Sequence, residues 1–251
     1  MINTIQHPNG VREIQMARPP ANAMNAELLH ALLAALKVAL ADETKVIVLS
    51  SDNPKIFSGG LDVPALVTYK EADLLAFFEL FFEVARTLSH SSKPIAAAIT
   101  GHSPAGGAVF ATACDYRVMA AGNSRIGLNE VEVALVVPKG TIAQLQRLVG
   151  VRMAERLTVE AQMITADEAY RVGWVDAAVP AEEVIPHAIA WAQKIAAFPP
   201  NALRKTRALA RADAMTAYDD AVDMGAVMRE IWQSPETQQT MMAFVMKLQK
   251  K

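Results

Sequence analysis

Two short apolar runs, each followed by a glycine-bearing turn, constrain the fold of this chain more than any other feature of its sequence. Lys45–Ser50 (KVIVLS) is rich in β-branched residues, and Pro94–Thr100 (PIAAAIT) contains small alanines that permit close packing. Runs of this length and composition are typical of strands that are covered on both faces. Because helices supply such cover, the runs predict an α/β protein.

The neighbouring segments support this interpretation. Asn25 can cap a first helix, and Glu71–Ser89 has the pattern of a second one. We expect a hairpin with an Asn-Gly turn over residues 2–16, and a further strand at Tyr116–Ala120. The alternation of helix, strand and glycine turn through residues 25–120 indicates βαβ units with mostly parallel strands.

Beyond Pro138 the pattern becomes mainly helical, with one short strand expected at Trp174–Val179. From Ala181 onward we expect three or four helices and no further strand. The chain is therefore predicted to consist of a core, residues 1–180, that carries the functional site, and a C-terminal helical region, residues 181–251.

Composition and charge exclude several classes of function. Hydrophobic residues make up 52% of the 251 residues, which indicates a globular chain, and the formal net charge of -2 argues against a nucleic-acid partner, which would favour a basic face. Its one cysteine, Cys114, cannot form an internal disulfide, which favours a reducing compartment. We see neither a signal-peptide pattern nor an apolar stretch long enough for a membrane helix, so no membrane partner and a cytoplasmic location are expected.

The two glycine-bearing turns are the candidate binding site. Phe57–Asp62 (FSGGLD) follows the first apolar strand, and Gly101–Gly107 (GHSPAGG) follows the second. In open α/β sheets, ligands bind beyond the carboxyl ends of the strands. Glycine lets backbone N–H groups approach a ligand, and two such turns can direct two donors at one oxygen, as an oxyanion hole requires. The alternative is that each turn is only a connection.

Three segments resemble a known family. FSGGLD at Phe57–Asp62 and PAGGAVFATACDYR at Pro104–Arg117 resemble the two signature segments of the crotonase, or enoyl-CoA hydratase/isomerase, superfamily. IGLNEVEVALVVP at Ile126–Pro138 resembles the mitochondrial-type Δ3-Δ2-enoyl-CoA isomerases in particular. The opening hairpin and the helical tail also fit, so the resemblance covers nearly the whole chain.

The resemblance implies a fold, an assembly and a substrate class. The fold is a crotonase-like spiral of ββα units with a C-terminal helical trimerisation region, in which the core carries the CoA site. The assembly is a homotrimer or a dimer of trimers. The substrate is an acyl-CoA thioester that brings coenzyme A with it, so no separate cofactor and no metal ion are expected.

The resemblance also implies roles for individual residues. The backbone N–H groups of Leu61 and Gly106 are expected to hold the thioester oxygen, while Ala21 and Ala23 lie near the adenine and pantetheine portions of CoA. The complete set of residues expected to bind the substrate is Ala21, Ala23, Ser58, Gly59, Gly60, Leu61, Asp62, Pro104, Gly106, Val109 and Asn129.

The number of carboxylates selects the reaction. Hydratases of this family use two glutamates to hold and activate a water, and the residue three positions after Gly106 is one of them. That position is Val109 here, while Glu130 matches the second glutamate. One base can take a proton from C2 and return it at C4, which moves a C3 double bond to C2. Glu130, with the amides of Leu61 and Gly106, is therefore predicted to catalyse enoyl-CoA isomerisation in fatty acid β-oxidation.

We expect Glu130 to lie in an apolar pocket near Val109, Leu135 and Val136, where burial raises its pKa toward neutrality. Glu132 is a rival base, but in an extended segment it would point to the opposite face. Two other readings stay open. One is another crotonase activity, such as hydration, thioester hydrolysis or dehalogenation; the other is a non-catalytic CoA-binding member.

Overall fold

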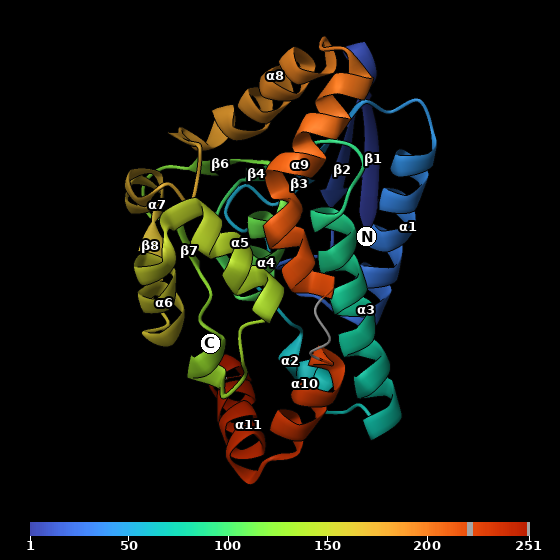
Figure 1. Cartoon of the computed structure of the whole chain (residues 1–251). Helices are drawn as coiled ribbons and strands as arrows, with labels where there is room; N and C mark the ends of the chain where they lie inside the picture. The colour runs from blue at the N-terminus through green and yellow to red at the C-terminus, as the bar shows by residue number, and fades with distance from the viewer. Residues whose placement is uncertain (220–222, 250–251) are drawn as a thin grey trace.

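The computed structural model describes residues 1–219 and 223–249; residues 220–222 and 250–251 of the predicted C-terminal region lie outside the described residues. Its centre is a six-stranded sheet, in the order β1-β2-β3-β4-β6-β9 (Figure 1). The strands are β1 (Ile2–His7), β2 (Val11–Met16), β3 (Val46–Ser51), β4 (Ile95–Ile99), β6 (Tyr116–Ala120) and β9 (Ala177–Val179). β1 and β2 form the expected antiparallel hairpin, and every other pair in the sheet is parallel. The prediction of an α/β protein is confirmed.

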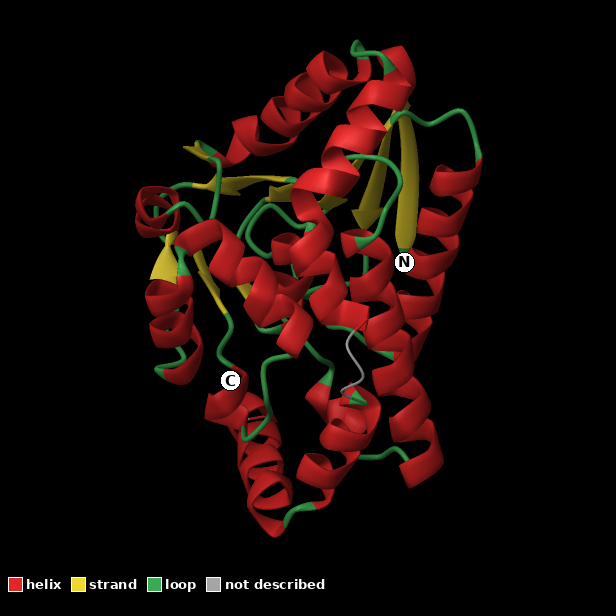
Figure 2. Cartoon of the chain, in the orientation of Figure 1, coloured by secondary structure: helices red, strands yellow, loops and turns green. Residues whose placement is uncertain are grey.

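Helices cover both faces of this sheet, which explains why β3 reads as an unbroken apolar run. Ile47 and Leu49 belong to the cluster formed with α1 (Ala26–Ala41) and α3 (Glu71–Ser89), whereas Val46 and Val48 belong to the cluster formed with α8 (Val184–Ala196). Successive side chains of a strand point to opposite faces, so a strand covered twice has no polar face. In Figure 2 the sheet lies in the upper half of the molecule, and the lower half is mainly helical.

The short helix α4 (Gly106–Ala113) is completely buried and follows the second glycine-bearing turn. The residue before it, Ala105, has φ 42°, a value that few residues other than glycine adopt. At the other end, the guanidinium groups of Arg117 and Arg211 both donate to the carbonyl of Cys114, at 2.7 and 3.2 Å. Cations at a helix C-terminus satisfy free carbonyls and complement the helix dipole, so α4 is fixed at its far end.

A second, three-stranded sheet was not predicted. It consists of β5 (Ser103–Pro104), β7 (Arg125–Gly127) and β8 (Ile164–Thr165). Strands of two or three residues carry too little sequence to show an alternating pattern. The sheet holds the second glycine-bearing turn beside the segment that leads into the 3-10 helix η2 (Glu130–Val133).

The remaining helices lie mostly beyond Pro138, as expected. They are α2 (Val63–Leu66), α5 (Lys139–Val149), α6 (Val151–Val159), α7 (Ala166–Val172), α9 (Pro200–Asp219), α10 (Met224–Gln233) and α11 (Pro235–Gln249), with 3-10 turns η1 (Pro8–Gly10) and η3 (Ala181–Glu183). Beyond Ala181 the described residues form four α-helices, α8 to α11, which confirms the predicted count. The division into a core and a C-terminal region at residue 180 stays a prediction.

The last two helices return to the core at the end opposite α8 (Figure 1). The ring of Trp232 in α10 packs edge-on against Phe78 of α3, with centroids 5.8 Å apart. The hydroxyl of Thr237 in α11 donates to the carbonyl of Ala134, just after η2, at 2.9 Å. Among the described residues, no helix combines the length and the apolar character that crossing a membrane requires.

Candidate active site

The two glycine-bearing turns lie in contact at the carboxyl ends of β3 and β4, which are adjacent parallel strands. A Cβ atom placed on Gly60 would lie 3.4 Å from the carbonyl oxygen of Pro104 and 3.8 Å from the amide nitrogen of Gly106. A Cβ atom on Gly106 would lie 3.6 Å from Cδ2 of Leu61. Gly60 also has φ 81°, so it is required both for its conformation and for the close approach.

The amide N–H groups of Leu61 and Gly106 are available to a ligand. Leu61 forms a parallel bridge with Met24, in which Met24 makes both hydrogen bonds: its N–H donates to Gly60, and its carbonyl accepts from Asp62. In this pairing the residue opposite directs its own N–H away from the partner strand. Gly106 is the first residue of α4, where an N–H has no acceptor inside the helix. Within residues 1–219 and 223–249, neither N–H donates a hydrogen bond to the protein.

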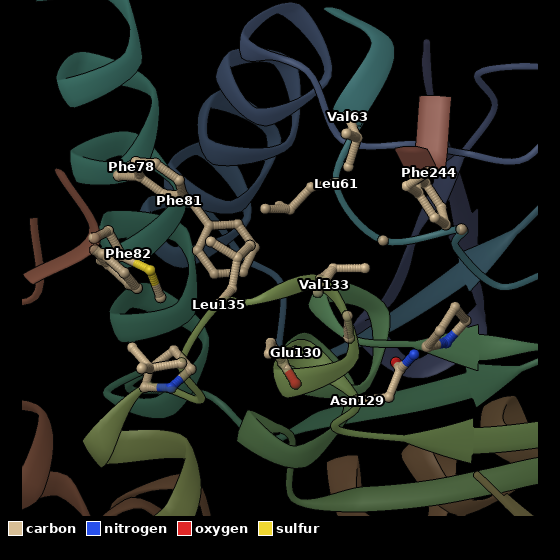
Figure 3. Close-up of a pocket in the computed structure, with 18 residues that line it drawn as sticks. Leu61, Val63, Phe78, Phe81, Phe82, Asn129, Glu130, Val133, Leu135 and Phe244 are labelled. Carbon is tan, nitrogen blue, oxygen red and sulfur yellow. The ribbon is translucent and has the colours of Figure 1, made fainter. Parts of the chain in front are cut away.

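Both turns open into an apolar cavity of about 210 Å³ (Figure 3). The lining consists of Gly59, Gly60, Leu61, Val63, Phe78, Phe81, Phe82, Pro104, Ala105, Gly106, Asn129, Glu130, Val133, Leu135, Val136, Pro138, Met228 and Phe244. The structure therefore brings seven of the predicted site residues together: Gly59, Gly60, Leu61, Pro104, Gly106, Asn129 and Glu130. Of the described side chains that line the cavity, Glu130 is the one that carries a titratable group.

The other predicted site residues lie outside this lining. Ser58 is buried, and its hydroxyl donates to the carbonyl of Asn22. Val109 is buried within α4, so the structure does not bear out the expectation that it belongs to the same pocket as Glu130. Asp62 accepts hydrogen bonds from Arg18, at 2.6 Å, and from the first turn of α2.

The remaining two, Ala21 and Ala23, belong to the segment that passes over the first glycine-bearing turn. The carbonyl of Ala21 accepts from the N–H of Gly59 at 2.7 Å. The carbonyl of Ala23 accepts from a guanidinium N–H of Arg18 at 2.9 Å. These contacts tie the segment to the turn, at the rim of the candidate site. Among the described residues, no three His, Cys, Asp or Glu side chains gather so that they could hold a metal ion.

Glu130 has the environment that the sequence predicts for a catalytic carboxyl group. It is 6% exposed, begins η2, and lines the cavity together with Leu135 and Val136. Its Oε2 atom has no hydrogen-bond partner. Burial therefore raises the pKa of Glu130 to about 8, which its own backbone N–H only partly opposes. This direction agrees with the predicted rise in the pKa of Glu130.

The segment around Glu130 is a four-residue 3-10 turn and not an extended strand. It ends at Ala134, which has φ 54°. Glu132 is exposed, and its carboxylate accepts from the side-chain amide of Asn129 at 2.9 Å. This bond directs the Asn129 nitrogen at Glu132 and leaves its Oδ1 atom buried without a partner. Glu132 does not line the cavity, which weakens it as a rival base.

The part of the apolar wall that α3, α10 and α11 supply was not predicted. Phe78, Phe81 and Phe82 line it from α3, and Met228 and Phe244 line it from α10 and α11. Spacings of three and four residues place the three phenylalanines on one face of a helix, so the run AFFELFF contains a usable signal. No local pattern identifies Met228 or Phe244, because they line the cavity only as a result of the packing of α10 and α11 against the core.

Both the sequence and the structure of this chain match known proteins. The enoyl-CoA hydratase/isomerase family model matches residues 6–251. The human protein named "Enoyl-CoA delta isomerase 1, mitochondrial" is 33% identical over 205 residues, which are 80% of this chain and 68% of the human one. The "Crotonyl-CoA hydratase" of Syntrophomonas wolfei is 31% identical over 211 residues, or 83% of this chain and 81% of its own.

The crystal structure of human mitochondrial delta3-delta2-enoyl-CoA isomerase superposes with a TM-score of 0.94 at 27% identity, covering 99% of this chain and 98% of that one. The predicted fold, with its C-terminal helices, is thereby confirmed. Relatives named as isomerases and as hydratases match at similar identity, so the comparison identifies the family and leaves the reaction to the chemistry of the site. By sequence, fold and the contact between its two glycine-bearing turns, this chain belongs to the enoyl-CoA hydratase/isomerase family, the crotonase superfamily.

Proposed function

We propose that this chain is a Δ3-Δ2-enoyl-CoA isomerase in which Glu130 is the only acid/base group. The observation that carries the proposal is that Glu130 is the single titratable side chain among the described residues lining an apolar cavity, which Leu61 and Gly106, with their available amides, also line. Removal of the C2 proton of an acyl thioester puts charge on the thioester oxygen. Two fixed N–H donors, from Leu61 and Gly106, stabilise that charge by roughly 3–4 kcal/mol each.

The proton balance of the reaction requires one carboxylate. Ionised Glu130 takes a proton from C2, electrons shift so that the double bond moves from C3–C4 to C2–C3, and the same carboxyl group returns the proton at C4. The raised pKa of Glu130 suits this role, because a carboxylate with a higher pKa is a stronger base. The apolar wall keeps bulk water away from the enolate.

Hydration is the rival reaction, and it needs a second group that holds and activates a water. The position of the other hydratase glutamate, three residues after Gly106, is occupied by Val109, which is buried in α4 and lies outside the cavity lining. Asn129 lines the cavity, but an amide oxygen does not take up a proton at neutral pH. These two observations support isomerisation over hydration.

The test is to offer 3-enoyl-CoA and 2-enoyl-CoA separately and to follow the absorbance of the conjugated thioester. We expect 3-enoyl-CoA to gain conjugation and 2-enoyl-CoA to keep it. Glu130→Gln should abolish turnover, and Glu132→Gln, a matched change in the same turn, should retain it. Loss of conjugation from 2-enoyl-CoA would identify a hydratase, and activity of Glu130→Gln would assign the base elsewhere.

The proposal includes a place for the protein in metabolism. Conversion of a C3 to a C2 double bond serves fatty acid β-oxidation, with acyl-CoA as the substrate and no separate cofactor. A cytoplasmic location and a homotrimer or dimer of trimers stay predictions. Light scattering on the purified protein tests the assembly.

A further inference from the structure

The acyl cavity is separated from a second hollow by two residues. Phe82 and Pro138 line the cavity that contains Glu130, and both also line an adjacent hollow of about 330 Å³. On the far side of these two residues the hollow is bounded by Met224 and Tyr218. Phe82 is half-buried and projects from α3 as a side chain, so its replacement can open the partition without altering the backbone.

The rings of α3 follow one another outward from the proposed oxyanion site. A Cβ atom on Gly106 would lie 3.3 Å from the Phe81 ring, so Phe81 borders the glycine directly. Phe82 contacts Phe81 edge-on with centroids 5.6 Å apart, and Phe78 is stacked on Phe82 at 6.4 Å. In Figure 3, Phe81 lies between Leu61 and Phe82. An acyl tail that leaves the thioester and follows this wall therefore passes Phe81 first and then reaches Phe82.

The size of the cavity limits how much of the tail it can hold. An apolar cavity of roughly 150 Å³ binds one benzene molecule, so at the same density the cavity here holds roughly eight non-hydrogen atoms. That is about the size of a six-carbon acyl group together with its carbonyl oxygen and sulfur. A longer chain would have to displace Phe82 or leave the cavity into water.

We propose that Phe82 determines the acyl-chain length, so that the enzyme selects acyl groups of about six carbons and excludes long-chain ones. This inference rests on the proposed function in one respect, namely that the ligand is an acyl-CoA. Phe82 closes the end of the cavity, so the substrate of the wild-type protein cannot enter the hollow behind it.

The hollow behind Phe82 is suited to accept part of a tail but not all of it. Phe82 and Met224 give it apolar surface, while Glu79, Glu83 and Arg86 at its border are exposed and charged. Methylene groups next to Phe82 would be buried, and those farther out would meet charge and water. Replacement of Phe82 by a smaller residue should therefore strengthen the binding of a long acyl chain, but only by the burial of a few methylene groups.

The experiment measures binding, so that it does not depend on turnover. The dissociation constants of butyryl-, hexanoyl- and dodecanoyl-CoA, all saturated and unreactive, are determined by calorimetry for the wild type, Phe82→Leu and Phe82→Ala. We expect the wild type to bind hexanoyl-CoA most tightly. In Phe82→Ala, dodecanoyl-CoA should gain about tenfold or more relative to hexanoyl-CoA, which corresponds to burying about two methylene groups. The relative gain of dodecanoyl-CoA in Phe82→Leu should lie between the values for the wild type and Phe82→Ala.

Phe77→Leu is the matched control for Phe82→Leu. Phe77 is buried in the same helix but lines neither hollow, so loosening of α3 alone should leave the ratio of the dodecanoyl-CoA and hexanoyl-CoA dissociation constants unchanged. Tight binding of dodecanoyl-CoA by the wild type, an unchanged ratio in Phe82→Ala, or an equal change of the ratio in Phe77→Leu would each overturn the assignment.

The two proposals fail in different ways. Selective binding without isomerisation of 3-hexenoyl-CoA would refute the isomerase and leave the role of Phe82 intact. Isomerisation that is insensitive to chain length would refute the role of Phe82 and leave the isomerase intact. Absence of binding by all three ligands would refute both, because both require an acyl-CoA in this cavity.

Discussion

Replacement of Glu130 by glutamine is expected to stabilise the protein at alkaline pH while it removes the activity. The carboxyl group is buried in the apolar cavity, and its pKa is raised from 4.5 to about 8. Between these two values the native protein keeps the proton that the unfolded chain has already released. Stability from the protonated group is complete below about pH 4.5 and is lost as the pH rises toward 8, so raising the pH favours unfolding.

The magnitude follows from the size of the shift. Each pKa unit corresponds to about 1.4 kcal/mol, and most of the shift lies between pH 5 and pH 8. The wild type should therefore lose about 3 kcal/mol of unfolding free energy over this interval from Glu130 alone. Glutamine does not titrate, so Glu130→Gln should not lose this amount. Other groups titrate in both proteins and cancel in the comparison.

The assay is urea unfolding of the wild type and Glu130→Gln at pH 5 and pH 8, at one protein concentration because assembly contributes to stability. The free-energy difference between the two proteins should grow by about 3 kcal/mol from the lower to the higher pH. Glu132→Gln is the control: Glu132 is exposed, so its difference from the wild type should stay small at both pH values. A difference for Glu130→Gln that changes by less than about 1 kcal/mol would refute a buried, neutral Glu130.

Three further predictions concern the same site and its support. The value of kcat/KM should rise about tenfold per pH unit below pH 8 and level off above it, because the ionised form of Glu130 is the base. A value of kcat/KM that stays constant from about pH 6 to 8 in stopped-flow assays would contradict this. Gly60→Ala should destabilise the protein by about 1–2 kcal/mol in urea titrations, because φ is 81°, and should lower kcat, whereas an unaltered kcat would separate this turn from the chemistry. Arg211→Met should lower the unfolding free energy by about 2 kcal/mol, because it removes the side-chain donor to the carbonyl of Ala113 and one of the two guanidinium groups that pair with Asp115; Arg204→Met, an exposed change in the same helix, should have little effect.

The central part of the fold could be predicted because its signals are local. The apolar runs at β3 and β4 are short, β-branched or alanine-rich, and bounded by turns, so periodicity and length alone identify them. The Asn25 side chain caps α1 by accepting from the N–H of Leu28 at 2.9 Å, as the sequence suggests. In contrast, β5, β7 and β8 form because separate loops pair with one another. Each strand has only two or three residues, which is too few to indicate its partner.

The candidate site shows the same division between local and long-range information. The amides of Leu61 and Gly106 and the carboxyl of Glu130 are found from motifs, because each motif fixes its own backbone. Much of the wall of the cavity comes from α3, α10 and α11. Its shape depends on how these distant segments pack together, which no single segment of the sequence predicts. The partition at Phe82 becomes visible only when both hollows on either side of it are seen.

Because Met228 and Phe244 form part of the cavity wall, enclosure of an acyl chain depends on α10 and α11. All three signature segments precede these helices in the sequence, so a truncated protein without α10 and α11 would keep every signature residue. Its cavity would nevertheless lie open to water along one side, which couples the dryness of the site to the docking of two helices that carry none of the signature residues.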